Sequence, residues 1–195
     1  MLTKKNHLRE YSQKEIAEEL IILEKAKTNP RHFAWLYEKH YKQVFLFIYR
    51  RTANHDLTGD LCSQVFLKAL NNLHKYEYRG LPFIAWLLRV SSNEVNMHFR
   101  KHKNDRTVSL EDAGLYRLSE EIETSDRHLK SDAIINCLDE LKEDEITLLE
   151  LRYFENHSVR EVAYILNESE SNIKVKTHRI IKKLKLIVGE RFNDE

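Results

Sequence analysis

The segment from Ile146 to Val188 constrains the fold most, because its pattern predicts a helix-turn-helix preceded by a supporting helix. Ser158 and Glu161 have the S-x-x-E spacing of a capping box, in which the hydroxyl accepts from a free backbone N–H and the carboxylate reaches back to the N-cap N–H. The apolar residues that follow repeat at helical spacing and predict one buried face: Val159, Val162, Ala163 and Leu166.

The second helix of the pair is predicted to follow a turn at Asn167 and Glu168, since Asn tolerates the left-handed backbone that tight turns require. Ser169 is its predicted N-cap. Four of its apolar residues can pack inward: Ile173, Ile180, Ile181 and Leu184. Its cations face elsewhere: Lys174, Lys176, His178, Arg179, Lys182, Lys183 and Lys185. A helix of this kind suits a DNA major groove, although a cationic solvent-exposed helix is an alternative interpretation.

Composition favours an all-helical chain with short connections. Of the 195 residues, 32% are charged and 42% hydrophobic, and only 4 are Gly and 2 are Pro. The net charge of +1 indicates no overall preference for nucleic acid, but the charge is segregated along the chain. Residues 138–155 hold seven acids and two bases, whereas residues 173–188 hold no acid. This local segregation matters more for contacts than the sum.

The cysteines and the N-terminus indicate an intracellular chain. Cys62 and Cys137 lie in apolar runs without ligand-like spacing and are expected to be buried small hydrophobic residues. The first 15 residues have no apolar core typical of a signal peptide, and no apolar run reaches the ~18 residues of a membrane helix. We therefore expect a cytoplasmic protein without membrane insertion.

Two helical domains are predicted, joined by a polar linker. Helices are expected at 12–27, 32–52, 57–74 and 83–102, with a loop at 76–82 before the last of these. Apolar and aromatic residues of the 32–52 helix are expected to form core: Phe33, Leu36, Tyr37, Tyr41, Val44, Phe45 and Ile48. The predicted boundaries are 1–12 for an N-terminal extension, 13–103 for the first domain, 104–125 for the linker and 126–190 for the second domain. The linker can hold a short helical piece, and the second domain is expected to contain four helices, one of them at 126–141, and to end in the helix-turn-helix.

Four segments together resemble the extracytoplasmic-function (ECF) group of bacterial RNA polymerase sigma factors. FAWLYEKHYKQVFLFIYRR looks like the opening helix of the promoter-melting domain, and DLCSQVFLKALNNLHKY looks like the core-polymerase-binding helix. RGLPFIAWLLRVSSNEVNMHFRKHK looks like the loop with the DNA-melting helix. LDELKEDEITLLELRYFENHSVREVAYILNESESNIKVKTHRIIKKL looks like the −35 domain. The resemblance implies a specificity subunit without enzymatic activity, cofactor or metal. Its partners would be core RNA polymerase (clamp helices and flap), promoter DNA and an anti-sigma protein.

The resemblance also implies three sets of contact residues. The −35 set, on the second helix of the helix-turn-helix, is Ser171, Asn172, Lys174, Val175, Lys176, His178 and Arg179. The −10 set, in the loop and the helix after it, is Tyr76, Tyr78, Arg79, Arg89, Asn93, Asn96, Arg100 and Lys101. The core-polymerase set is Asp60, Leu61, Gln64, Phe66 and Lys68. Without the resemblance, Asn93 is most simply an ordinary exposed helix residue.

Several positions depart from the family pattern. Lys174 and Lys176 stand where arginines are common, and Lys lacks the bidentate guanidinium fork, so base discrimination is expected to differ. Ser63-Gln64 replaces the usual Gln-Glu and removes an acid from the expected polymerase surface. Asn156 and Asn167 replace glycines, and both can adopt positive φ. Thr177 replaces an apolar residue, and its hydroxyl is expected to bond the carbonyl four residues earlier.

Two other function classes fit less of the sequence. His98 and His102 have the i, i+4 spacing of metal ligands, but no Glu stands between them as a catalytic base and their surroundings are cationic. No Gly-rich phosphate loop or nucleophile elbow is present. A stand-alone helix-turn-helix regulator would explain the C-terminal pattern, but it leaves the aromatic-rich first domain unexplained. Such a regulator would bind an operator without polymerase.

Overall fold

The computed structural model describes residues 11–101, 112–122 and 140–193, and the regular structure in these ranges is entirely helical. The chain forms two compact units, an N-terminal unit made mainly of residues 8–109 and a C-terminal unit made mainly of residues 110–195. The predicted all-α fold with two helical domains, the second containing a helix-turn-helix, is confirmed. Most of the helix predicted at 126–141 lies outside the described residues, as does Cys137.

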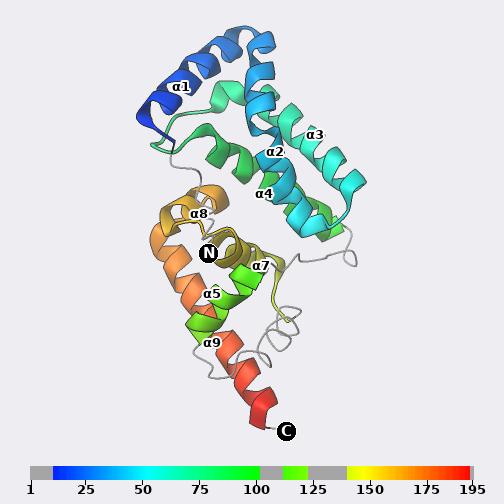
Figure 1. Cartoon of the computed structure of the whole chain (residues 1–195), viewed down its shortest axis with the longest axis vertical. Coiled ribbons are helices and arrows are strands. Elements are labelled where there is room, and N and C mark those ends of the chain that lie inside the picture. The colour runs from blue at the N-terminus through cyan, green and yellow to red at the C-terminus, as the bar shows by residue number, and fades with distance from the viewer. Residues whose placement is uncertain (1–10, 102–111, 123–139, 194–195) are drawn as a thin grey trace. The chain divides into compact units, whose positions relative to one another are not determined.

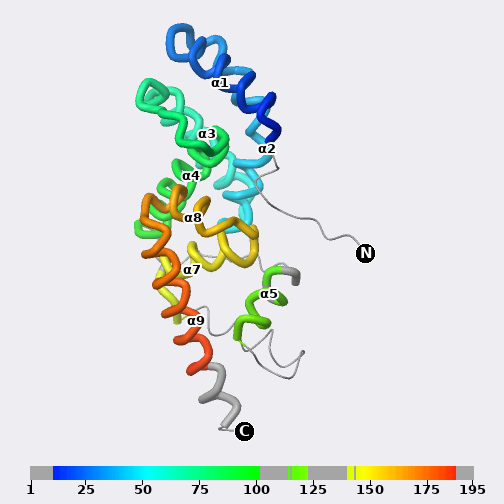
Figure 2. Tube along the Cα trace, turned by 90° about the vertical axis from the view of Figure 1, so that its left-hand side faces the viewer, coloured from blue at the N-terminus to red at the C-terminus, as the bar shows by residue number. Residues whose placement is uncertain are grey.

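The N-terminal unit contains α1 (Gln13–Thr28), α2 (Phe33–Thr52), α3 (His55–Asn71) and α4 (Phe83–Lys101). Figures 1 and 2 show α2, α3 and α4 side by side, with α1 packed on α2. Fully buried apolar side chains from these helices form the core, including Leu36, Val44, Ile48, Val65 and Leu87. Cys62 is buried among them, as predicted.

Local capping interactions set the ends of these helices. Ser12 and Glu15 form a capping box at the start of α1, and the Asn54 side chain accepts from the Leu57 N–H at the start of α3. α2 is capped at its C-terminal end by Ala53, whose φ of 45° places a residue with a Cβ in the left-handed region. Short 3-10 turns, η1 (Pro30–His32) and η2 (Leu73–Lys75), complete the connections.

The aromatic row on α2 lies at the edge of the core rather than inside it. Tyr37 is 40% exposed and Tyr49 39%, while Tyr41 and Phe45 are partly exposed. Neighbouring rings along the row are 5.2 to 6.1 Å apart, and Phe66 of α3 covers one side of Tyr37. The prediction that Tyr37, Tyr41 and Phe45 belong to the core is therefore corrected, because these residues lie near the apolar face of α2 but not at its centre.

The C-terminal unit contains α5 (Asp112–Ile122), α7 (Glu143–Leu149), α8 (Val159–Leu166) and α9 (Glu170–Asn193). α7 continues directly into a π-helical segment, η3 (Glu150–Phe154). The core is again apolar, with Leu149, Leu151, Val162, Ile173 and Leu184 buried.

The helix α5 lies within the range predicted as a polar linker, and it packs against η3 and α9 (Figure 1). Leu118 is buried, and Arg117 donates from Nε to the Tyr153 carbonyl at 2.6 Å and from Nη2 to the Phe154 carbonyl at 3.1 Å. Gly114 lies so close that an added Cβ would be 2.2 Å from the Phe154 ring. This part of the linker range is thus folded onto the C-terminal unit.

Among the helices of the described ranges, none combines the length and apolar character needed to cross a bilayer.

Candidate nucleic-acid interface

The helix-turn-helix has the local geometry that its sequence predicts. The Ser158 N–H donates to Glu161 Oε2 at 2.7 Å, and Ser158 Oγ accepts from the Glu161 N–H at 3.2 Å. Asn167 has a φ of 59°, and Asn156, before α8, has a φ of 58°. Ser169 Oγ accepts from the Asn172 N–H at 3.2 Å, so Ser169 caps α9. The capping box, the turn and the second cap are therefore confirmed.

The two faces of α9 also divide as predicted. Ile173, Ile180, Ile181 and Leu184 are buried, and Thr177 Oγ1 donates to the Ile173 carbonyl at 2.8 Å. The exposed residues of the −35 set are Ser171, Asn172, Lys174, Val175, His178 and Arg179. Lys176 is partly buried. The structure thus brings most of the −35 set onto one outer surface of α9.

A residue that the sequence analysis did not assign to any site, Glu168, holds two members of the −35 set. Its Oε1 lies 2.7 Å from Lys176 Nζ, and its Oε2 accepts from Asn172 Nδ2 at 2.6 Å. Glu168 stands in the turn directly before the Ser169 cap, so its carboxylate lies at the N-terminal end of α9. The spacing of Glu168 and Asn172, four residues apart, was the signal available in the sequence.

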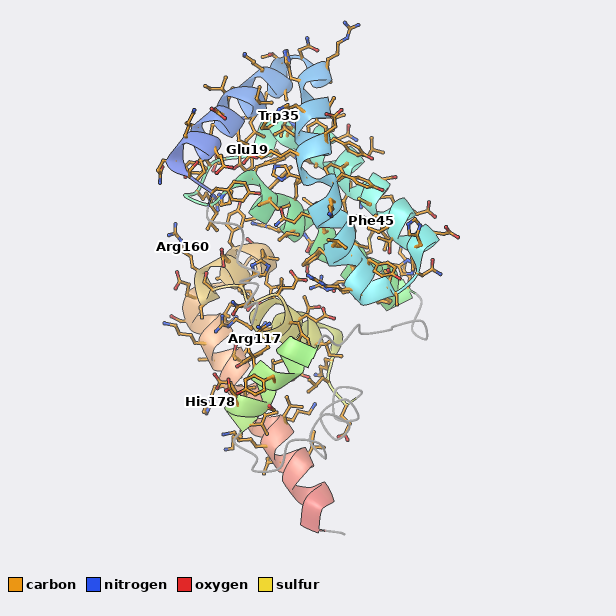
Figure 3. All side chains as sticks on the ribbon, in the orientation of Figure 1. Glu19, Trp35, Phe45, Arg117, Arg160 and His178 are labelled. Atoms are coloured by element: carbon orange, nitrogen blue, oxygen red, sulfur yellow. The ribbon has the colours of Figure 1, made fainter. Side chains whose placement is uncertain are left out.

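A groove lies between α5 and α9 and continues the basic side of α9, the recognition helix of the helix-turn-helix. Glu121 contributes from α5, and the floor includes Arg152 and Tyr153 of η3. The basic residues of α9 that border it are Lys174, His178, Lys182 and Lys185. Figure 3 labels Arg117 and His178 on these two neighbouring helices. The groove holds more positive than negative side chains and so favours an anionic strand beside α9.

A buried histidine lies at the start of the helix-turn-helix. His157 Nε2 is 3.1 Å from Glu155 Oε2, and its Nδ1 is 3.8 Å from Glu161 Oε2. Arg152 Nη1 donates to the His157 carbonyl. Burial by itself lowers the pKa of His157, but the carboxylates of Glu155 and Glu161 outweigh burial and raise the pKa to about 9. His157 is therefore a cation at neutral pH.

The loop before α4 presents part of the −10 set and buries another part. Gly80 has a φ of 74°, which allows the chain to turn into Leu81 and Pro82. Tyr78 is 43% exposed, and Arg79 is exposed with Nη2 3.3 Å from a Glu77 carboxylate oxygen.

Tyr76 is 5% exposed and packs edge-on against Phe83 and Trp86, and burial raises the pKa of its hydroxyl. Unlike the exposed members of the −10 set, Tyr76 has its ring inside the unit, where it supports the loop.

The −10 residues of α4 share one face of the helix. Arg89, Asn93, Asn96 and Arg100 are spaced i, i+4, i+7 and i+11, which aligns them along one side. Asn93 and Arg100 are exposed, and Arg89 and Asn96 are partly exposed. Arg100 Nε donates to the Asn96 carbonyl at 3.4 Å. Lys101 is exposed beside this row.

A buried carboxylate on α1 supports the start of α4 and was missed from the sequence. Glu19 is 1% exposed, and its Oε1 lies 2.8 Å from Lys39 Nζ and 2.7 Å from His40 Nε2. Its Oε2 accepts from the Phe83 backbone N–H at 3.1 Å, at the first residue of α4 (Figure 3). Burial raises the pKa of Glu19, but His40 and then Lys39 outweigh it and lower the pKa below its ordinary value. Glu19 thus ties α1 and α2 to the end of the −10 loop.

The predicted core-polymerase set splits into surface and framework residues. Asp60, Gln64 and Lys68 are exposed at i, i+4 and i+8 on one side of α3, and Lys68 Nζ lies 2.5 Å from Glu94 Oε2. Leu61 is 3% exposed and Phe66 is 4% exposed. The side chains of Leu61 and Phe66 pack into the core beneath α3, so they can only shape this surface from below, and polymerase contact by the set stays a prediction.

The described residues contain no group of three His, Cys, Asp or Glu side chains placed to bind a metal ion. Of the spaced histidine pair, His98 lies on α4 and His102 lies outside the described ranges.

Comparison with known proteins identifies the family. The Sigma-70 region 2 family model matches residues 36–105, and the Sigma-70, region 4 family model matches residues 131–184. The RNA polymerase sigma factor YlaC of Bacillus subtilis is 30% identical over 154 residues, which cover 77% of this chain and 88% of the relative. The chain belongs to the RNA polymerase sigma factors.

Its type within this family is the ECF type. The ECF RNA polymerase sigma factor SigM of Bacillus subtilis is 26% identical over 161 residues, covering 82% of this chain and 97% of that protein. A solved sigma factor, RpoE in complex with the anti-sigma factor NepR from Bartonella quintana, has the same fold, with a TM-score of 0.50. It is 19% identical and covers 80% of this chain and 96% of that chain.

The two matched regions account for both helical domains, whereas a stand-alone regulator would leave region 2 unexplained. This ECF sigma factor therefore functions with core RNA polymerase and promoter DNA in transcription initiation.

Proposed function

We propose that this ECF sigma factor recognises its promoter with two surfaces. The outer face of α9 reads the −35 duplex, and the 76–82 loop with the outer row of α4 holds the melted −10 strand. The observation that supports the proposal is that every residue of both sets, apart from Tyr76, is exposed or partly exposed.

The chemistry of α9 suits a duplex. Ser171 and Asn172 lie in its first turn, where the positive end of the helix dipole favours phosphate oxygens. Lys174 and Arg179 are exposed cations that can pair with phosphates or guanine edges. Val175 is 46% exposed and can contact a thymine methyl group. Binding at this surface sets the position and register of the sigma factor on the promoter and involves no covalent step.

The chemistry of the loop and α4 suits a single strand. Tyr78 offers an exposed ring on which an unstacked base can rest, a contact worth about 1–3 kcal/mol. Arg79, Arg89 and Arg100 can follow the phosphates, and Asn93 can bond a base edge. Free energy from these contacts, added to polymerase binding, favours the open −10 region over the paired one. The exposed row Asp60, Gln64 and Lys68 on α3 is the proposed polymerase contact.

We infer three further properties from the family. The chain acts as a DNA-recognition subunit and performs no catalysis of its own. It works in the cytoplasm, where core polymerase and DNA are found. An anti-sigma protein holds it inactive until a signal releases it, as the complex of RpoE with NepR suggests by analogy.

The test of the −35 surface compares Arg179→Ala with Lys42→Ala in holoenzyme reconstituted from core polymerase. Arg179 lies on the proposed surface, whereas Lys42 is an exposed cation on α2 outside both DNA surfaces. We expect Arg179→Ala to weaken binding to the intact promoter by about 5–100-fold, the range for a base-reading Arg. Binding to a promoter with a scrambled −35 element should change much less. Equal effects of the two variants would contradict the assignment of α9.

The test of the −10 surface is Asn93→Ala. We expect unchanged co-elution with core polymerase and slower formation of the open complex, measured by permanganate reactivity over time. Loss of polymerase binding would show instead that Asn93 is structural.

A further inference from the structure

The acidic residue in the helix-turn-helix turn is paired with the recognition helix itself. Glu168 Oε1 lies 2.7 Å from Lys176 Nζ, and the two side chains are 23% and 36% exposed. Asn172 donates from Nδ2 to the other oxygen, Oε2, at 2.6 Å. Asn172 therefore fixes the carboxylate so that its second oxygen faces Lys176.

This pairing distinguishes Lys176 from the other cations of the −35 set. Within the described ranges, no carboxylate pairs with Lys174, His178 or Arg179. Lys176 is thus the cation of this set whose charge is already matched by the protein. To reach a phosphate, its ammonium must leave Glu168 or bring that carboxylate beside the DNA polyanion, and both cost free energy.

The geometry points to Glu168 as a specificity-determining residue of the −35 surface. Its carboxylate keeps Lys176 from pairing with phosphates of any sequence, so a larger share of the affinity depends on base contacts. This inference rests on the proposed function of α9.

Phosphate contacts form on any duplex, whereas base contacts form only on the correct one. On the promoter, base contacts hold α9 in one register, whereas on a wrong duplex α9 can settle wherever its cations best reach phosphates. Holding Lys176 on Glu168 therefore lowers nonspecific binding more than specific binding, and specificity is the difference between these two affinities. A Lys side chain can be held by a carboxylate in this way because its ammonium is a point charge on a flexible stem.

Glu168→Gln is the informative substitution, and Glu170→Gln is its matched control. Glutamine keeps the shape and an oxygen that can accept from Asn172, but it removes the charge that holds Lys176. Glu170 is the first residue of α9, is exposed, and its carboxylate has no ion pair or hydrogen bond within the described ranges. Both substitutions remove one negative charge from the same end of α9. The Glu168–Lys176 pair is partly exposed to solvent and Glu170 is exposed, and ion pairs near the surface contribute little to folding, so both variants should fold.

The experiment measures binding of reconstituted holoenzyme to a promoter duplex and to the same duplex with a scrambled −35 element, across a range of salt concentrations. We expect Glu168→Gln to tighten binding to the scrambled duplex severalfold more than binding to the promoter. The slope of log affinity against log salt should steepen by about 0.9, the value for one added phosphate contact. Glu170→Gln should change both duplexes by the same factor and leave the slope unchanged.

The double variant Glu168→Gln with Lys176→Met tests the mechanism, because Lys176 is the group that would be released. The steeper slope and the loss of discrimination should both disappear in this variant. The inference is overturned if Glu168→Gln behaves as Glu170→Gln does, or if its effect persists without Lys176.

Failure of the inference and failure of the proposed function can be told apart with Arg179→Ala. If Arg179→Ala reduces −35 discrimination while Glu168→Gln changes binding to both duplexes by the same factor, α9 reads DNA and Glu168 has no role in specificity. If Arg179→Ala leaves discrimination unchanged, the assignment of α9 is wrong, and the inference about Glu168 is overturned with it.

Discussion

The stability of the helix-turn-helix should depend on pH through His157. This imidazole is buried between Glu155, 3.1 Å from Nε2, and Glu161, 3.8 Å from Nδ1, and Arg152 bonds its carbonyl. Glu161 also closes the capping box with Ser158, so the protonated ring stabilises the carboxylate that starts α8. The proposed perturbation is His157→Gln, which removes the titrating charge and keeps a polar side chain.

The structure sets both the magnitude and the sign of this effect. The pKa of His157 rises from an ordinary 6.5 to about 9 on folding. Because one pKa unit corresponds to about 1.4 kcal/mol, the protonated ring adds about 3 kcal/mol to the stability of this region. The folded pKa is the higher one, so the contribution is fully present below pH 6.5 and is lost as the pH rises through about 9. His157→Gln should lower the stability of this region below pH 6.5 and leave it unchanged well above pH 9.

Two measurements check this prediction. The Hε1 resonance of His157, assigned by its disappearance in His157→Gln, should titrate near pH 9. Hydrogen exchange of the α8 amides, corrected for intrinsic rates, should be faster in the variant than in the parent below pH 6.5 and equal well above pH 9. Trp35 and Trp86, the two Trp residues of the chain, both lie in the N-terminal unit. Their fluorescence should therefore show an unchanged unfolding transition and serves as an internal control. Titration at or below pH 6.5 would refute the reasoning.

Two further substitutions test the packing. Glu19→Gln removes the charge that faces Lys39 and His40 in a buried site, so we expect about 3 kcal/mol of destabilisation in urea unfolding followed by Trp fluorescence. A change below about 0.5 kcal/mol would mean that the buried ion pair contributes little. Gly114→Ala places a Cβ 2.2 Å from the Phe154 ring, so α5 should exchange its amides about 5- to 150-fold faster, which corresponds to an overpacking cost of about 1–3 kcal/mol. Unchanged amide exchange would show that α5 can shift to make room for the Cβ without losing stability.

The sequence predicted features that depend on a few neighbouring residues. The Ser158–Glu161 capping box and the Ser169 cap need only short-range hydrogen bonds, and both form as predicted. Positive φ at Asn156 and Asn167 follows from the tolerance of Asn for that conformation. The inward face of α9 follows from helical spacing alone. Such features are local, so the sequence around them is sufficient to predict them.

The features that the sequence did not predict depend on partners distant in the chain. Glu19 lies on the apolar side of α1, but its partners Lys39, His40 and Phe83 lie about 20 to 64 residues away. No residue near Glu19 in the sequence therefore indicates that its buried carboxylate is paired. Tyr76 stands in a polar loop and is buried only because Phe83 and Trp86 cover it.

A short helical piece was expected within the linker range, but the packing of α5 on η3 and α9 was not predicted, because a helix that buries only one narrow stripe remains mostly polar. For the candidate site, helical spacing predicted which residues share a face. It could not predict that Glu168 pairs with Lys176, because the pair joins a turn to the second turn of α9.

The most direct test of the account is permanganate footprinting of a promoter with core RNA polymerase, with and without the purified chain. We predict that the chain co-elutes with core polymerase and that thymines near −10 become reactive only when both are present. The reactivity should develop more slowly with Asn93→Ala. If the chain fails to associate with polymerase and protects duplex DNA on its own, the account of promoter opening is contradicted.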